Sequence, residues 1–318
     1  MQVINTELMR NECGTNMELT YMTDSNDLAN KMCQLMPQAG VMSTDVPNLT
    51  LVRSDEVMPS SKPIIYEPCI YIVIQGKKVA ALGSDDYIYD GLNYLVLSVP
   101  LPLECQVLEA SVEKPYLAVK VDINTEMLNE LIEESTANLK KADDSPVKKG
   151  IFVSRLGDNI RATLERILSY VDQPASAKVL GAMAIKELLF HVLAGAQGHY
   201  LRAFAYRDKQ SFQIAAVINF IQSHYTESIE VADLASRANM SQSSFHHYFK
   251  AVTSSSPIQY IKTIRLHAAR RNMLYDNKSA GDAAYHVGYS SPSQFSREYR
   301  RLFGVSPSID MQLSTIDV

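Results

Sequence analysis

The sequence predicts an α+β protein of two domains, an N-terminal antiparallel β-barrel with a helical extension and an all-α C-terminal double helix-turn-helix domain. The chain has 318 residues, enough for two domains of roughly 150 residues each. Short β-branched and aromatic runs fill residues 63–123, and apolar residues recur at helical spacing beyond them. A helix–turn–helix pattern then occurs twice, with corresponding residues 50 positions apart.

The composition is that of a globular protein. Apolar residues make up 46% of the chain and charged residues 20%, so a core of ordinary size can form. The four cysteines are widely spaced, as expected of reduced thiols in a cytosolic protein. The N-terminus lacks the apolar stretch of a signal peptide, and no run approaches the ~18 apolar residues of a membrane span. We therefore expect a cytoplasmic protein that does not contact the membrane.

Charge divides the chain unevenly. The net charge is −5, which argues against a uniformly basic surface for nucleic acid. Residues 1–210 carry 20 Lys and Arg against 27 Asp and Glu, whereas residues 211–318 carry 10 against 8. The C-terminal part is therefore better suited to approach a polyanion.

The N-terminal part predicts the barrel. Residues 1–60 suggest mixed helix and loop. From residue 63, strand-like runs are separated by Gly76, Gly83 and Gly91, at intervals of seven and eight residues. Short strands with regular turn signals are typical of an antiparallel barrel or sandwich, which we place at about 64–123.

Helical spacing predicts the extension over residues 125–206, interrupted by a polar loop at 140–150. Its Leu and Ile stripes fit either a dimer interface or packing within the domain. The whole N-terminal domain, for effector sensing or dimerisation, is expected at 1–206. A polar linker at 207–212 would then lead to a DNA-binding domain at 213–311.

Residues 231–251 have the pattern of a helix-turn-helix unit. The small Ala235 allows a second helix to cross closely. Asn239 lies at the turn, because Asn tolerates the left-handed conformation that ends a helix. Ser241 offers a hydroxyl that caps the next helix. Aromatic residues form the inward face of that helix: Phe245, Tyr248 and Phe249.

Residues 279–302 repeat the pattern. Ala284 and Gly288 keep the four-residue interval of the first unit, and Phe295 and Tyr299 are its inward aromatic residues. A long helix over 257–275 is expected between the units, with a proline in its first turn. Its apolar side is expected to contain Ile258, Ile261, Ile264 and Ala268.

The C-terminal motifs resemble the signature of the AraC/XylS family of bacterial transcription regulators. These motifs are Val287-Gly288-Tyr289-Ser290, Phe295-Ser296-Arg297 and Phe303-Gly304-Val305-Ser306-Pro307. Residues 64–135 are similar to the N-terminal domain of one AraC subgroup, through Cys69–Lys77, Tyr94–Val99, Glu109–Ser111 and Pro115-Tyr116.

The resemblance implies a sequence-specific DNA-binding transcription regulator. Its N-terminal domain would be a cupin-like barrel that senses a small organic effector or mediates dimerisation. The implied partners are a double-stranded DNA operator, the effector, RNA polymerase and a second copy of the chain. No cofactor is expected.

The resemblance and the helix faces together predict the DNA contacts. The base-reading residues would be Ser243, His246 and His247 in the first unit and Ser293, Gln294 and Arg297 in the second. Arg297 is the strongest candidate, because Arg pairs bidentately with guanine, although a solvated surface Arg is the competing interpretation. His246 and His247 fit either base contact or a weakly bound first helix. The phosphate contacts would be Ser241, Lys250, Ser290 and Arg300.

The barrel offers candidates for an effector pocket. Its tyrosines are Tyr71, Tyr87, Tyr89, Tyr94 and Tyr116, for most of which core packing is the competing role. Cys69 and Cys105 would be buried inert thiols or electrophile sensors. No metal is expected, because residues 1–190 contain no histidine and the carboxylates suit turns and surfaces: Glu67, Asp85, Asp86, Glu104 and Glu109.

No catalytic residue is expected. The sequence contains no nucleophile elbow, Walker loop, dinucleotide fingerprint or H-E-x-x-H motif. The alternative is a small-molecule-binding or enzymatic β-barrel protein whose helices form an oligomerisation scaffold.

Overall fold

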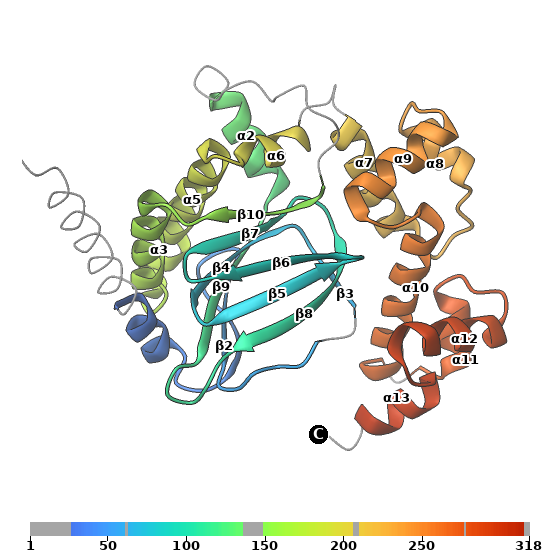
Figure 1. The fold of residues 1–318 in the computed structure, drawn as a ribbon, viewed down its shortest axis with the longest axis horizontal. Coiled ribbons are helices and arrows are strands. Elements are labelled where there is room, and N and C mark those ends of the chain that lie inside the picture. Colours follow the sequence, from blue (N-terminus) through green and yellow to red (C-terminus); the bar gives the residue numbers. More distant parts are fainter. Residues whose placement is uncertain (1–26, 61–62, 136–148, 206–209, 277, 315–318) are drawn as a thin grey trace, which may run out of the picture.

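The computed structural model describes residues 27–60, 63–135, 149–205, 210–276 and 278–314. It contains an N-terminal domain of two antiparallel sheets with helices on one side, and a C-terminal helical domain (Figure 1). This layout confirms the predicted fold class. Among the described residues no helix is long and apolar enough to cross a membrane.

Within the described ranges, ten strands form the two sheets. The six-stranded sheet has the order β1-β2-β9-β4-β7-β10, and the four-stranded sheet has the order β3-β8-β5-β6. Their bounds are β1 Gly40–Ser43, β2 Leu49–Ser54, β3 Ile64–Tyr66, β4 Cys69–Gln75, β5 Lys77–Leu82, β6 Asp85–Asp90, β7 Asn93–Leu97, β8 Leu101–Glu109, β9 Tyr116–Asp122 and β10 Ile151–Arg155.

The larger sheet is buried on both faces, which explains the continuous apolar run of β4. Ile70 and Ile72 point to a core shared with the N-terminal helices, whereas Tyr71 and Val73 point to a core shared with the second sheet. The turn between β4 and β5 requires a glycine. Gly76 has φ +83°, and a Cβ there would lie 2.5 Å from the main-chain oxygen of Glu109.

The sheets extend beyond the predicted 64–123. Strands β1 and β2 lie in the segment expected to be mixed helix and loop, where residues 27–35 are indeed helical. Strand β10 lies in the segment expected to be helical or loop. It pairs antiparallel with β7, with Ile151 opposite Leu97. These are corrections, and their cause is pairing with strands that are distant in the sequence.

The helical extension consists of several pieces. They are α2 Thr125–Ser135, α3 Asp158–Tyr170, α4 Pro174–Ser176, the π-helical turn η1 Ala177–Gly181, α5 Ala182–Ala194 and α6 Gly198–Ala203. The chain from 174 to 203, where helical spacing was expected, therefore contains the π-helical turn η1 and a break after α5. Residues 136–148, which include most of the predicted polar loop, lie outside the described residues.

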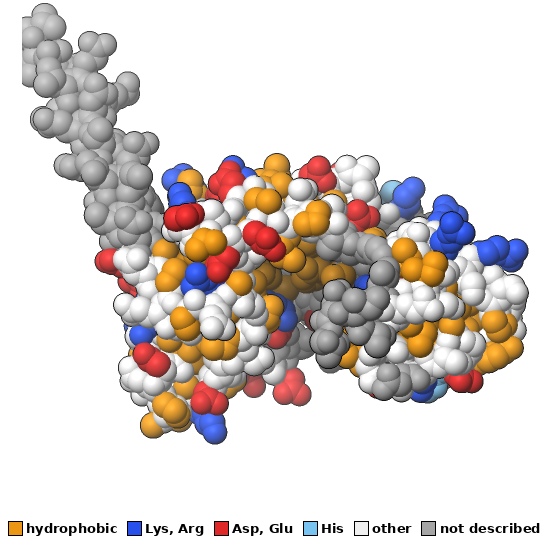
Figure 2. Space-filling model, turned by 90° about the horizontal axis from the view of Figure 1, so that it is seen from below, with side chains coloured by type: hydrophobic (Ala, Val, Ile, Leu, Met, Phe, Trp, Pro, Cys, Tyr) orange, Lys and Arg blue, Asp and Glu red, His pale blue; other side chains and the backbone are white. Residues whose placement is uncertain are grey.

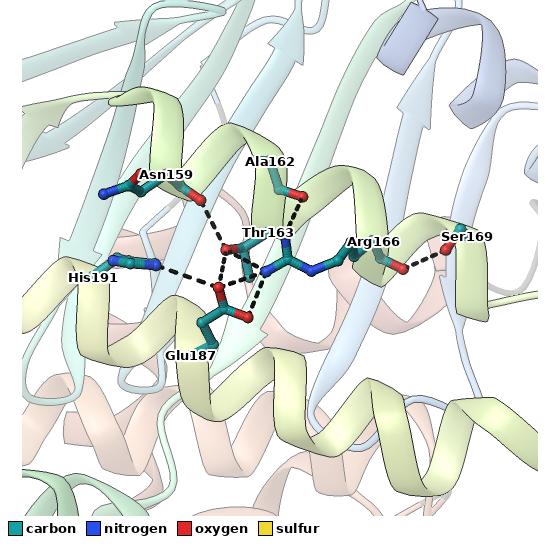
Figure 3. Close-up of polar contacts among 7 residues, drawn as sticks. All are labelled: Asn159, Ala162, Thr163, Arg166, Ser169, Glu187 and His191. Atoms are coloured by element: carbon teal, nitrogen blue, oxygen red, sulfur yellow. Dashed lines mark hydrogen bonds and ion pairs between the residues drawn. The ribbon is translucent and has the colours of Figure 1, made fainter.

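A polar cluster joins α3 to α5 (Figure 3). Glu187 of α5 accepts hydrogen bonds from Thr163 and Arg166 of α3. His191 Nε2 lies 3.5 Å from Glu187 Oε1. The hydrogen bond from Arg166 holds the pKa of Glu187 below its usual value. This cluster is partly exposed, so it fixes the register of the two helices more than it stabilises them.

The C-terminal domain contains seven helices among the described residues. They are α7 Gln210–His224, α8 Val231–Arg237, α9 Gln242–Thr253, α10 Pro257–Leu274, α11 Ala280–His286, α12 Pro292–Phe303 and α13 Pro307–Ser314. The predicted helix-turn-helix units are present as α8–α9 and α11–α12. Residues 210–212, expected to belong to the linker, form the first turn of α7 instead, and residues 207–209 lie outside the described residues.

The two domains share a core. Buried residues of α7, α9 and α10 belong to the same apolar cluster as the interior of the sheets. Gly150 N, just before β10, donates a hydrogen bond of 3.0 Å to the main-chain oxygen of Val252 in α9. The second unit has a separate core, formed with the C-terminal half of α10 and with Met311 of α13. The first unit therefore packs against the barrel, whereas the second packs against the C-terminal half of α10 (Figure 1).

Candidate nucleic-acid interface

Both helix-turn-helix units use the same backbone turn. In the first unit, Met240 N donates to Ala235 O at 3.0 Å, and Asn239 has φ 52°. In the second, Tyr289 N donates to Ala284 O at 3.0 Å, and Gly288 has φ 88°. These bonds define a Schellman motif, which ends α8 and α11 with a left-handed residue. The predicted turn residues are thereby located at the turns.

The second helix of each unit begins at a serine cap. Ser241 Oγ accepts a hydrogen bond from Ser244 N at 3.2 Å, and Ser291 Oγ accepts one from Gln294 N at 3.3 Å. Ser291, not Ser290, is therefore the structural counterpart of Ser241. Ser290 is exposed beside this cap. Each hydroxyl satisfies a main-chain N–H that helix geometry leaves free.

The inward and outward faces of α9 and α12 are sharply divided. Phe245 and Phe249 in α9, and Phe295 and Tyr299 in α12, are buried. All six predicted base-reading side chains are exposed: Ser243, His246, His247, Ser293, Gln294 and Arg297. So are the four residues predicted to contact phosphate: Ser241, Lys250, Ser290 and Arg300.

Two of the outward residues, Gln294 and Arg297, differ in whether their side chains are hydrogen-bonded within the protein. Gln294 Nε2 donates to Glu298 Oε1 at 3.2 Å, so its amide is partly engaged within α12. The guanidinium of Arg297 makes no hydrogen bond or ion pair with any other residue that the structure describes. An unengaged guanidinium on an exposed helix face is free to meet a ligand. Lys and Arg side chains gather at the outer edge of the C-terminal domain in Figure 2.

Two carboxylates attach the second unit to α10. Glu298 of α12 accepts hydrogen bonds from Lys262 Nζ and Tyr289 Oη, each at 2.7 Å. Burial opposes ionisation of Glu298, but these bonds outweigh it and hold its pKa below its usual value. Asp310 of α13 accepts bonds from Arg270 and from Tyr299 Oη. These contacts fix the orientation of α12, and so of its outward face, relative to α10.

The helix between the units has the predicted extent, but one residue of its predicted apolar side is exposed. Helix α10 has Ser256 as its cap and Pro257 at its first position. Ile258, expected on the apolar side, is 50% exposed. Pro257 and Tyr260 take the buried positions of the first turn instead, and Ile261, Ile264 and Ala268 continue the buried side.

The predicted effector tyrosines do not form one group. Tyr71, Tyr89 and Tyr116 are buried in the core between the sheets, with Tyr71 and Tyr89 packed edge to face at 6.0 Å. Tyr87 is half-buried beside them. Tyr94 points to the opposite face of the larger sheet, into the core with α3 and α5, and so cannot share a pocket with the others. The inclusion of Tyr94 in the predicted pocket was therefore wrong.

A charged residue that the sequence analysis did not single out lies among these tyrosines. Lys78 is only 8% exposed, and its Nζ lies 4.4 Å from the centroid of the Tyr71 ring and 5.8 Å from that of Tyr66. Burial opposes its charge, but its neighbours, Tyr71 foremost through its proximity and a side-chain hydrogen bond, outweigh burial and hold the pKa of Lys78 above its usual value. No carboxylate is among the groups that shift this pKa in the described part of the chain. Strand alternation could have found it, because Lys78 is in phase with the inward-facing Ala80 and Leu82.

The barrel cysteines are buried among the same side chains. Burial raises the pKa of the Cys69 thiol to about 12, so it stays protonated. Cys105 is also buried. Two of the barrel carboxylates, Asp85 and Glu109, form surface ion pairs with lysines. Among the described residues, no three His, Cys, Asp or Glu side chains gather as metal ligands would.

A cavity of about 250 Å³ lies where β3 faces α10. Glu67 lines it from the barrel side, and His267 and Arg271 of α10 line the other side with Tyr275, which follows that helix. Burial and the neighbouring Arg270 and Arg271 lower the pKa of His267 to about 4. The imidazole is therefore neutral at physiological pH.

Comparisons with known proteins place the chain among regulators. Residues 45–200 match the family model described as AraC-type transcriptional regulator N-terminus, and residues 234–310 match the helix-turn-helix domain. The chain is 33% identical over 108 residues to the probable transcriptional regulator LumQ of Photobacterium leiognathi. That match covers 34% of this chain and 44% of LumQ, so it spans less than half of that relative.

Two longer matches cover both domains. The chain is 22% identical over 267 residues to the thermoregulatory protein LcrF of Yersinia pestis, covering 82% of this chain and 95% of LcrF. An apo form of a ToxT variant from Vibrio cholerae superposes with a TM-score of 0.56 at 16% identity, covering 83% of this chain and 97% of ToxT. The similarity to ToxT shows a shared fold.

Proposed function

The chain belongs to the AraC-type transcriptional regulators, and from this premise we propose that it binds operator DNA in a sequence-specific manner and regulates transcription in the cytoplasm. Its N-terminal domain would respond to a small organic effector or mediate dimerisation. An activator role would add RNA polymerase as a partner.

One observation carries this proposal. Two capped helices, α9 and α12, present polar side chains outward from the same kind of turn on either side of one rigid helix. An α-helix of this kind fits the major groove, where its early residues reach base edges. Arg297, exposed and unengaged, would pair with guanine O6 and N7. Lys250 and Arg300 would neutralise phosphates, which orients the protein and strengthens binding without specifying sequence.

The effector proposal rests on Lys78. A buried ammonium is costly unless a counter-charge or hydrogen bonds compensate it. The ring and the side-chain hydrogen bond of Tyr71 favour the charged form of Lys78, but no carboxylate of the described residues neutralises it. An effector that carries a carboxylate would supply the missing counter-charge inside the barrel. We therefore propose an acidic organic molecule, with Tyr71, Tyr89 and Tyr116 around its apolar part and Tyr87 at the edge.

The dimer proposal rests on exposed apolar side chains of η1 and α5, here called the α5 patch. It consists of Val179, Leu180, Met183 and Phe190, of which Met183 is 65% exposed. The opposite side of α5, with Leu188 and Val192, packs within the domain. The helical stripes therefore serve both roles in this proposal: internal packing on one side and pairing with a second copy on the other.

The alternative, an enzymatic barrel with a helical scaffold, leaves the exposed faces of α9 and α12 without a role. Selection of operators from random-sequence duplex DNA with the full-length chain tests the proposal. We expect enrichment of sites with two conserved half-sites about 10 base pairs apart, one helical turn, for two major-groove helices on one side of the duplex. Retention of all sequences equally, or of none, would contradict it.

A further inference from the structure

Arg265, in the middle of α10, joins the segment that leads into the first helix-turn-helix unit to the turn of the second unit, through main-chain oxygens. Its Nε donates to Tyr225 O at 2.7 Å, and its Nη2 donates to Glu227 O at 2.6 Å. These two oxygens belong to the connection between α7 and α8, which leads into the first unit. Its Nη1 donates to Gly288 O at 3.3 Å, in the turn of the second unit.

The chemistry of the guanidinium suits this role. It is planar and offers five N–H donors in a fixed arrangement, so one side chain can hold three oxygens from two segments in a defined geometry. A lysine ammonium is a compact point charge and cannot reproduce this arrangement. Arg265 is half-buried, which strengthens hydrogen bonds relative to those in water.

The backbone around Arg265 is packed closely. A Cβ on Gly288 would lie 2.6 Å from Thr226 O and 3.2 Å from Arg265 Cζ. The turn of the second unit therefore rests directly on the α7–α8 connection and on the guanidinium. The corresponding residue of the first unit, Asn239, is exposed and carries a side chain. The contact thus explains why one turn contains glycine and the other asparagine.

Among the described residues, no helix of the first unit packs extensively against a helix of the second. Their buried residues belong to separate clusters, and Tyr225 is a partly buried residue that packs against both. Two ion pairs, Lys262–Glu298 and Arg270–Asp310, attach the second unit and α13 to α10 and do not reach the first unit. The angle between the units therefore depends on α10 and on the contacts of Arg265.

We propose that Arg265 is a positioning residue that fixes the rotation between α9 and α12, and so determines which spacing of DNA half-sites the protein accepts. This inference rests on the proposed DNA-binding function. Successive base pairs of B-DNA are rotated by about 34°, because one turn contains about 10.5 base pairs. Inserting one base pair between half-sites therefore rotates one against the other, and a rigid pair of helices cannot follow.

The test uses the full-length chain and the operator that the wild type selects from random duplex DNA. Derivatives of that operator gain or lose one or two base pairs between the half-sites. Dissociation constants are measured for wild type, Arg265→Lys, Arg265→Gln and the matched control Arg271→Lys, which changes an exposed arginine of the same helix. Circular dichroism at the binding temperature identifies the folded variants, and the glutamine variant, which introduces no buried charge, covers the case in which the lysine variant unfolds.

We expect the wild type and Arg271→Lys to lose about tenfold or more in affinity when one base pair is inserted, comparable to a mismatched base pair or more. The folded Arg265 variants should bind the original operator more weakly and lose clearly less on insertion. A variant that is folded and retains the full spacing penalty overturns the inference and leaves the proposed function intact. A wild type that tolerates the insertion also overturns it. A wild type that selects no operator refutes the proposed function itself.

Discussion

Tyr260 and Pro100, 160 residues apart in the sequence, are joined by a hydrogen bond of 2.7 Å from the tyrosine Oη to the proline main-chain oxygen. Tyr260 lies in the first turn of α10 and is buried, whereas Pro100 lies between β7 and β8 of the barrel. Burial raises the pKa of Tyr260, so the hydroxyl remains a donor at any physiological pH. The bond therefore connects the barrel directly to the helix that joins the two DNA-binding units.

Tyr260→Phe should weaken this connection without disturbing packing. Loss of the bond leaves a buried carbonyl without its donor, so we expect a decrease of about 1 to 2 kcal/mol in the free energy of unfolding. Urea denaturation measures it. Tyr275→Phe, at the exposed residue that follows the same helix, is the control and should change stability very little. Equal effects of the two substitutions would mean that the interdomain bond contributes nothing specific.

His267 should make the protein less stable in mild acid. Its pKa is about 4 in the folded chain, whereas an unfolded histidine titrates near 6.5. Between these values the unfolded chain binds the extra proton, so this contribution to stability is complete above about pH 6.5 and decreases as the pH falls toward 4. His267→Gln should flatten the dependence of unfolding free energy on pH in this window.

His286→Gln is the control for the pH experiment, because His286 is exposed in the same domain. Its pH dependence should match that of the wild type. If the wild type and His267→Gln lose stability in parallel from pH 6.5 to 4, the buried imidazole is not the cause.

Lys78→Met should abolish recognition of acidic effectors. The probe is a panel of short- and medium-chain carboxylic acids and the matching uncharged amides, measured by the rise in melting temperature. A carboxylate that binds only the folded state stabilises it by an amount that rises with the logarithm of its concentration relative to its dissociation constant, so acids should raise the melting temperature of wild type and amides should not. Lys77→Met, which changes the neighbouring surface ion pair with Glu109, should respond like wild type. The assignment would be refuted if Lys78→Met still distinguished acids from amides.

Met183→Glu should separate the dimer. A carboxylate within the α5 patch would have to be buried unpaired in the dimer interface, which is strongly unfavourable. Sedimentation equilibrium should show a dimer for wild type and a monomer for the variant. Val112→Glu makes the same kind of change at an exposed valine outside the patch and should leave the dimer intact. A dimer that persists in Met183→Glu would place the interface elsewhere.

The C-terminal units were predictable because their signals are local. Each turn is marked by a residue that tolerates positive φ, Asn239 or Gly288, and each following helix by a serine cap within three residues. The caps, turns and inward aromatic residues all depend on neighbours in the same unit. The contacts of Arg265, in contrast, join oxygens 40, 38 and 23 residues away, and no local pattern indicates them.

The N-terminal domain was less predictable because its signals depend on pairing. Strand β10 is short, and its partner β7 lies more than 50 residues earlier in the chain. Tyr94 and Leu95 are neighbours on a strand and point to opposite faces, but only the pairing shows which face is the barrel interior. Lys78 was overlooked although strand alternation places it inside, because lysines are rarely buried without a partner.

The central claim is that α12 reads bases, and Arg297→Ala tests it most directly. The measurement is the dissociation constant of the full-length chain on its selected operator and on random duplex DNA, at several salt concentrations. Lys250→Ala is the comparison, because Lys250 is exposed near the end of α9 and is assigned to phosphate. It should weaken both kinds of DNA similarly and reduce the salt slope by about one unit.

Arg297→Ala should cost roughly 1–3 kcal/mol on the operator and much less on random DNA, with preference relaxed at one base position. Equal losses on operator and random DNA would show that Arg297 contacts only phosphate, and would contradict the assignment of α12 as a base-reading helix.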